Sequence, residues 1–116
     1  MPLVEIRRNS AVIDDQILLN IIESLPPIAA DVLSTKGGKL DPEEIMIEVD
    51  EASPFDRHVK DLNIRIRGHN FQERLENHDA IRRRISEEVL RHLPDGISWY
   101  VWLDLVPISY GSDTEP

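Results

Sequence analysis

The sequence contains no cysteine, so it can form no disulfide, no cysteine-ligated zinc or iron–sulfur site and no thiol nucleophile. Aromatic residues make up only 5% of its 116 residues, and no apolar run approaches the roughly 18 residues that suggest a membrane span. Lys and Arg number 13 against 22 Asp and Glu, and the resulting net charge of −9 repels nucleic-acid backbones and anionic membranes. We therefore expect a cytoplasmic protein that binds neither nucleic acid nor membranes.

The rest of the composition is that of an ordinary globular chain, with 41% hydrophobic and 30% charged residues. This length predicts a single domain over residues 1–116. The four histidines show no H-x-x-H or H-E-x-x-H spacing, and the one pair of glycines lacks the Lys and Ser/Thr of a phosphate loop. No serine lies in a nucleophile-elbow context. We therefore expect neither a metal site nor a cofactor.

The first half of the chain has the pattern of a strand, a helix and a second strand. Residues 3–8 alternate apolar and charged side chains, which is typical of a strand with one buried face. Apolar residues three and four apart predict a helix over about 14–34. Pro26 and Pro27 inside it must either split or kink it, and we expect a bend. Alternation resumes over residues 44–50, which predicts the second strand.

The second half repeats this order of elements. The patterns predict a strand over 62–67, a turn at 68–70, a helix from about Glu73 to Leu93 and a strand over 98–106. The halves match in element order and spacing more than in identity, which indicates an internal duplication. The expected boundaries are a first β-α-β unit (2–50), a linker (51–61), a second β-α-β unit (62–106) and a polar C-terminal tail (107–116).

Two tandem β-α-β units predict an α/β (α+β) fold, in which a four-stranded sheet carries both helices on one face because crossover connections are right-handed. The residues expected to face the helices are Val4, Ile6, Ile64, Ile66, Trp99, Val101 and Leu103. Alternation then places on the opposite face Leu3, Glu5, Arg7, Met46, Glu48, Asp50, Asn63, Arg65, Arg67, Tyr100, Trp102 and Asp104. Contact with water accounts for the charges but not for Met46, Tyr100 and Trp102, so we expect subunit association to bury part of this face.

A chain that begins Met1-Pro2, continues directly into a hydrophobic strand and repeats one β-α-β unit resembles the tautomerase superfamily. This family includes 4-oxalocrotonate tautomerase, 5-carboxymethyl-2-hydroxymuconate isomerase, malonate semialdehyde decarboxylase and macrophage migration inhibitory factor (MIF). The resemblance extends from Pro2 to about Val106. It implies a MIF-like fold, a homotrimer, and an isomerase that moves a proton on a small enol or keto carboxylic acid without a cofactor.

The proline at position two has chemistry that fits such a reaction. Removal of Met1 would leave Pro2 with a secondary amine, which is a good base only if its charged form is disfavoured. Burial and nearby cations lower the pKa of an amine in this way. The candidate cations are Arg7 and Arg8 on the first strand and Arg65 and Arg67 on the first strand of the second unit. The same guanidinium groups would bind the carboxylate of the substrate and stabilise a developing enolate.

Hydratase-like and decarboxylase-like members of the family imply a variant of this site, in which Pro2 stays protonated and acts as an acid. The resemblance then implies that Arg65 and Arg67 are the paired arginines. It also implies that Glu48 or Asp50 is the carboxylate that activates or orients water. Tyr100 and Trp102 are candidate substrate contacts, although such rings more often fill a core or a trimer interface.

A second hypothesis comes from a different functional class. The chain could be a non-catalytic trimeric binding or assembly module, with the same fold or with a ferredoxin-like one. The direction of the strands separates these folds. Two parallel β-α-β units joined by the 51–61 linker favour the tautomerase fold, whereas a hairpin between Asp50 and Leu62 favours the ferredoxin-like fold.

Overall fold

Strands and helices alternate along the chain in the computed structural model, which describes residues 1–113. The elements are β1 (Leu3–Arg8), α1 (Asp15–Leu33), the 3-10 helix η1 (Pro42–Glu44), β2 (Met46–Glu51), β3 (Leu62–His69), α2 (Gln72–Glu76), α3 (His78–Leu90) and β4 (Trp99–Val106). Beyond β4 the chain has no regular structure as far as residue 113. The last residues of the predicted tail, 114–116, lie outside the described residues.

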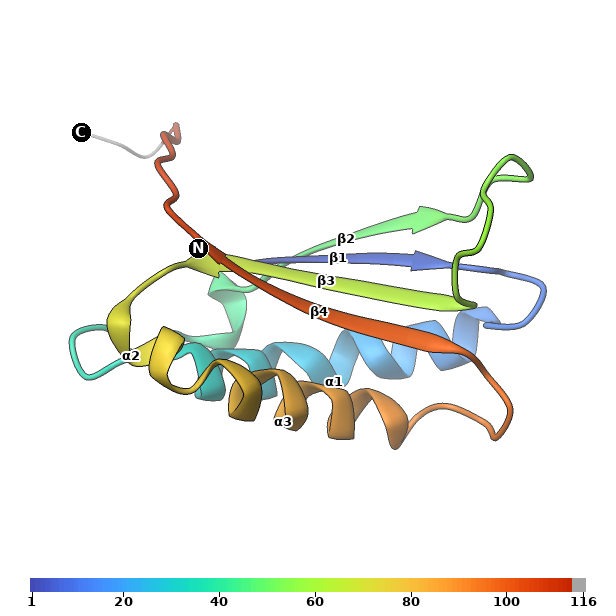
Figure 1. Ribbon diagram of the computed structural model, residues 1–116, viewed down its shortest axis with the longest axis horizontal. Coiled ribbons are helices and arrows are strands. Elements are labelled where there is room, and N and C mark those ends of the chain that lie inside the picture. Colours follow the sequence, from blue (N-terminus) through green and yellow to red (C-terminus); the bar gives the residue numbers. More distant parts are fainter. Residues whose placement is uncertain (114–116) are drawn as a thin grey trace.

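The four strands form one mixed sheet in the order β2-β1-β3-β4 (Figure 1). β1 pairs with β2 in parallel, β3 pairs with β4 in parallel, and β1 and β3 join the two units in antiparallel fashion. β2 and β3 are not neighbours, so the hairpin of the ferredoxin-like alternative is absent from this sheet. β2 begins two residues later than predicted because residues 42–44 form η1.

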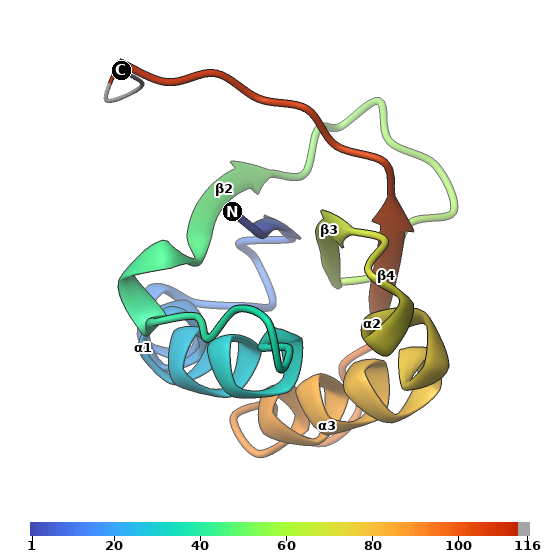
Figure 2. The same cartoon turned by 90° about the vertical axis from the view of Figure 1, so that its left-hand side faces the viewer.

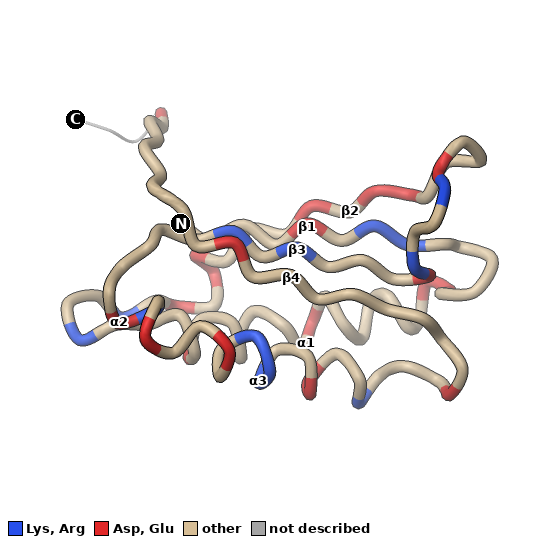
Figure 3. The backbone as a smooth tube through the Cα atoms, in the orientation of Figure 1, with Lys and Arg blue, Asp and Glu red and all other residues tan. Residues whose placement is uncertain are grey.

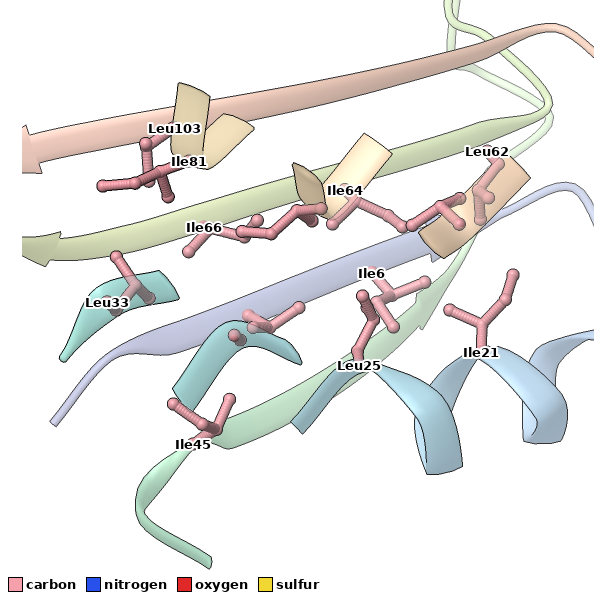
Figure 4. Close-up of a cluster of buried hydrophobic side chains, with 14 of the residues drawn as sticks. Ile6, Ile21, Leu25, Leu33, Ile45, Leu62, Ile64, Ile66, Ile81 and Leu103 are labelled. Carbon is pink, nitrogen blue, oxygen red and sulfur yellow. The ribbon is translucent and has the colours of Figure 1, made fainter. Parts of the chain in front are cut away.

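All the helices cover one face of the sheet, as the right-handed crossovers predict (Figure 2). Val4, Ile6, Ile64 and Ile66 point to this face and are at most 1% exposed. They pack against Ile21 and Leu25 of α1 and Ile81 of α3 in a single hydrophobic cluster (Figure 4). The predicted division of the sheet into a helix-facing side and an open side is therefore confirmed, with Trp99 and Val101 only partly buried.

Helix α1 runs without interruption through Pro26 and Pro27, so the prolines do not split it. At its start the Asp14 carboxylate accepts a hydrogen bond from the Ile17 amide at 2.9 Å. At its end the Ser34 hydroxyl donates to the Ala30 carbonyl at 2.7 Å. The prolines remove two amide donors from the helix, and burial of its apolar face compensates for the hydrogen bonds that are lost.

The buried face of α1 is broader than the predicted stripe because the helix packs against both the sheet and α3. Ile21 and Leu25 are fully buried as expected, whereas Ile17, Ile28 and Val32 are only partly buried. The other buried residues are Leu18, Ala29, Ala30 and Leu33. By length and composition α1 is also the one helix of residues 1–113 that could cross a membrane, a test that helices of a hydrophobic core also pass.

The single helix predicted from Glu73 to Leu93 is wrong: the structure has two helices, α2 and α3, separated at Asn77. Asn77 has φ −110° and ψ 19°, and its side-chain amide donates to the Glu73 carbonyl at 2.8 Å. A side chain that bonds to the backbone in this way competes with the continuing helix. As a consequence Leu75, expected in the apolar stripe, is 40% exposed.

Substitution of Leu25 by Ala is expected to lower the free energy of unfolding by about 2–5 kcal/mol, because a fully buried side chain leaves a cavity between α1 and the sheet. Leu19→Ala is the matched control, since Leu19 lies on the same helix and is 49% exposed. Its expected effect is below about 1 kcal/mol. Urea denaturation of both variants measures the difference, and equal losses would contradict the assigned face of α1.

Candidate functional site

Pro2 lies at the start of β1, on the side of the sheet that the helices cover, and is buried. Its carbonyl accepts a hydrogen bond from the Met46 amide at 3.0 Å, which ties this end of β1 to β2. Met1, which precedes it, is 51% exposed. Removal of Met1 would therefore place a secondary amine at the boundary between the core and solvent.

Arg67 lies closest to Pro2 among the arginines named from the sequence, because its partner across the β1–β3 pairing is Leu3. Its side chain is on the open face and makes no ion pair or hydrogen bond with any of residues 1–113. Arg65 lies one step further along β3, where it forms an ion pair with Asp104 at 3.4 Å. Its guanidinium also lies 5.6 Å from the ring centre of Trp102. In Figure 3 these two arginines are the blue segments on β3.

Arg7 and Arg8 lie at the opposite end of β1, about 17 and about 20 Å from Pro2 at the usual rise of a strand. Arg7 donates two hydrogen bonds to one Asp56 oxygen, at 2.7 and 3.0 Å. A backbone hydrogen bond from Ser53 and then this guanidinium lower the pKa of the Asp56 carboxyl. Within one subunit, the structure therefore does not bring Arg7 and Arg8 together with Pro2.

Arg8 is 8% exposed and is enclosed by acidic side chains. It forms ion pairs with Glu51 at 2.8 Å and Asp15 at 2.7 Å, and it donates to the Ile13 carbonyl at 3.2 Å. Hydrogen bonds to Glu51 and Asp15 raise its pKa. Arg8 therefore connects β1, β2 and the start of α1.

The other predicted residues lie over the middle of the open face. A cleft of about 400 Å³ is lined by Arg7, Asp50, Arg65, Tyr100 and Trp102 together with Glu5, Ile6, His58, Val59, Asn63 and Ile64. The rings of Tyr100 and Trp102 meet edge to face, with centres 5.6 Å apart. Glu48 is exposed on β2 opposite Glu5 and is not among the residues that line the cleft. Apart from Arg8 and Glu48, the predicted residues thus divide between this cleft and the Pro2 end of the sheet.

Arg74 was not expected from the sequence, yet it is 5% exposed and has no carboxylate partner among residues 1–113. Its Nε donates to the Leu33 carbonyl at 2.8 Å and its Nη1 to the His69 carbonyl at 3.1 Å. Its guanidinium stacks on Phe71, 4.9 Å from the ring centre. Burial lowers the pKa of this arginine, and the group remains a cation at neutral pH.

Gly68 lies between Arg74 and the Pro2 end of β1. The antiparallel pairing ends at Leu3 with Arg67, so the next residues along, Pro2 and Gly68, are opposite each other, about 5 Å apart at Cα. A Cβ on Gly68 would lie 3.2 Å from Nη1 of Arg74. The glycine therefore lets the guanidinium approach the backbone of β3 from the helix side, the side on which Pro2 is buried.

A groove of about 1020 Å³ lies on the other side of this end of the sheet. Its floor includes Met1, Leu3, Met46 and Arg67, and its remaining walls come from residues 107–113. Within residues 1–113, no group of three or more His, Asp or Glu side chains is placed to hold a metal ion.

No family model matches the sequence, and no curated protein matches it significantly. Solved structures do match its fold. A symmetric trimer of wild-type fused 4-OT superposes with a TM-score of 0.70 at 13% identity, over 97% of this chain and 92% of the other. FG41 malonate semialdehyde decarboxylase inhibited by 3-bromopropiolate gives 0.69 at 12% identity, over 97% and 91%. An MIF-like protein from Entamoeba histolytica gives 0.63 at 14% identity, over 97% and 95%.

The chain has the tautomerase-superfamily fold. The match covers both β-α-β units, since it takes in nearly the whole chain in each comparison. At 12–14% identity the likeness concerns the fold, and the neighbours include enzymes of more than one reaction. The chemistry of this tautomerase-fold chain must therefore be argued from its own residues.

Proposed function

We propose that this protein transfers a proton on a small enol or keto carboxylic acid, with the amine of Pro2 as the acid or base after removal of Met1. The observation that carries the proposal is the buried Arg74 guanidinium, which lies on the same side of the sheet as Pro2 and has no carboxylate partner among residues 1–113. A buried cation without a carboxylate partner reduces stability, and a substrate carboxylate bound to it would offset that cost.

Burial and a neighbouring cation both favour the neutral form of an amine. The buried position of Pro2 and the nearby guanidinium of Arg74 are therefore expected to lower the pKa of the freed amine towards neutral pH. A neutral amine can take the proton from carbon and return it to the other end of the enol system. If the amine instead remains charged, it acts as the acid of a hydratase-like or decarboxylase-like reaction.

The substrate carboxylate would be bound by arginines on both sides of this end of the sheet. Arg74 approaches from the helix side, and Arg67 lies on the open face without a partner among residues 1–113. Arg65 is the next cation along β3. The remaining proposed substrate contacts are Arg7, Arg8, Glu48, Asp50, Tyr100 and Trp102, and those at the far end of the sheet would reach Pro2 only from a neighbouring subunit.

A homotrimer is part of the proposal. Met46, Tyr100 and Trp102 are each 44–47% exposed on the open face of the sheet, and association would remove their apolar surface from water. One structural neighbour is described as a fused 4-OT symmetric trimer. Packing of three sheets through their open faces would bring one subunit's Pro2 end close to another subunit's cleft.

Pro2→Ala is expected to reduce the rate of enol–keto conversion of phenylenolpyruvate or 2-hydroxymuconate by about 10²–10⁴-fold, because the amine of alanine is a primary amine with a different geometry and basicity. Mass spectrometry of the same samples establishes that Met1 has been removed. Arg83→Ala is the matched control, since Arg83 is exposed on α3. Processed wild-type protein that is inactive on both acids, or an active Pro2→Ala variant, would refute the catalytic proposal and favour the assembly module.

Arg74→Lys is expected to raise KM for the carboxylic acid by about tenfold or more while kcat changes less, because lysine keeps the charge but cannot bind a carboxylate with two parallel hydrogen bonds. Arg83→Lys provides the same chemical change on an exposed surface. A thermal melt separates loss of binding from loss of fold, since Arg74 also bonds to the Leu33 carbonyl. An unchanged KM in folded Arg74→Lys would show that Arg74 is structural only.

Trp102→Arg is expected to convert the trimer into monomers, because it places three charges where the open faces would meet. Light scattering coupled to size-exclusion chromatography measures the mass. Leu19→Arg, on the exposed side of α1, is the control and should leave the mass unchanged. A wild-type mass of one subunit would exclude the trimer, whatever the activity.

A further inference from the structure

Residues 107–113 form a roof over the groove at the Pro2 end of the sheet. The segment leaves β4 and crosses the open side of the sheet towards β2 (Figure 2). Pro107, Ile108 and Tyr110 line the groove from above, whereas Leu3 and Arg67 line it from below. Access to the open side of this end therefore depends on what holds the roof in place.

Within the described part of the chain, one hydrogen bond connects residues 107–111 of the roof to the strand beneath them. The Ile108 amide donates to Nδ1 of His69, the last residue of β3, at 3.1 Å. Among residues 107–111 no other hydrogen bond to the rest of residues 1–113 is present. A backbone N–H can only donate, so Nδ1 must be a bare acceptor and the ring must be neutral, with its proton on Nε2.

Protonation of His69 would turn this contact into two donors facing each other. An imidazolium carries a proton on both nitrogens, so it could no longer accept from Ile108. Imidazoles take up this proton between about pH 5 and 8. The contact is thus one that a change of pH can break without any other rearrangement.

His69 also contacts the groups around Arg74. Its ring meets Phe71 edge to face with centres 4.7 Å apart, and its carbonyl accepts from Nη1 of Arg74. Arg74 in turn stacks on the face of Phe71. One residue therefore joins the roof of the groove to the buried cation beneath the sheet.

We propose that His69 is a proton-sensitive latch, which ties residues 107–111 to the end of β3 when neutral and releases them when protonated. The groove holds about 1020 Å³ of space with the contact formed, and release of the segment would widen access to it for an anionic ligand. This regulation concerns the groove itself and does not require that Pro2 be catalytic.

Charged groups of both signs surround the latch and set the pH at which it opens. Arg74 approaches from α2, and Arg67 lies two residues away on β3. Asp104 stands opposite Arg67 on β4, and Asp113 belongs to the walls of the groove; the ammonium of Met1, where this residue is retained, lies at its floor. The cations oppose protonation of His69 and the two carboxylates favour it.

The test is solvent-exchange NMR on the full chain, which gives the protection of the Ile108 amide relative to its intrinsic exchange rate at pH 8 and pH 5. We expect protection in the wild type to fall at least about fivefold at pH 5, the loss of one ordinary hydrogen bond. The fall should follow the titration of the His69 ring. Unchanged protection while the ring titrates, or a ring that stays neutral at pH 5, would overturn the proposal.

Two substitutions separate protonation from a simple loss of structure. His69→Asn supplies a side-chain oxygen near the position of Nδ1 and cannot titrate, so Ile108 should stay protected at both pH values. His69→Ala should leave it unprotected at both. His58→Ala is the control, because His58 is exposed and makes no hydrogen bond within residues 1–113; it should behave as the wild type does. A pH-dependent loss in folded His69→Asn equal to that of the wild type would refute the latch.

Discussion

The antiparallel pairing of β1 with β3 is the contact on which the rest of the structure depends. Each β-α-β unit contributes one central strand, and the helix-facing side chains Val4, Ile6, Ile64 and Ile66 are almost completely removed from water. One such unit alone would leave its central strand unpaired on one edge, so the two units stabilise each other. The same pairing brings the start of β1 against the end of β3, which is why the N-terminal end of the chain lies close to both Gly68 and the C-terminal segment.

The arginines at the two ends of the β1–β3 pair have different kinds of partner. At one end Arg8 has two carboxylates and Arg7 has a third, so these guanidinium groups are neutralised and connect β1 to neighbouring segments. At the other end Arg74 is buried with backbone carbonyls and an aromatic ring for partners. In a chain with 22 acidic residues against 13 basic ones, carboxylates are abundant. A buried cation left without one reduces stability, a cost that the proposed binding of a substrate carboxylate would offset.

The sequence predicted the sheet well and did not predict the burial of Arg74, for physical reasons. A strand with one buried face carries an apolar side chain at every second residue. This pattern predicted the bounds of β1 (Leu3–Arg8) correctly, and it also assigned the two faces of β1 and of the neighbouring β3 correctly. The break between α2 and α3 at Asn77 depends on one side-chain hydrogen bond, which the spacing of apolar residues in the sequence does not reveal. That break turns Arg74 inward and Leu75 outward. In the sequence, the burial of Arg74 is indicated by Gly68, six residues before it. This spacing is informative only once β3 and α2 are known to face each other.

The distribution of charge also decides how an anionic ligand would be captured. A net charge of −9 repels anions at long range, but this field is screened within about 8 Å at physiological ionic strength. Attraction must therefore come from groups that a ligand touches, and a guanidinium in a poorly hydrated site interacts more strongly than one in water. Arg67 is exposed and would make the first contact, whereas Arg74 is buried and would hold the ligand. Association at such a site depends on contacts at short range, so the proposed latch between His69 and the segment that follows β4 would affect it more than steering by the whole molecule.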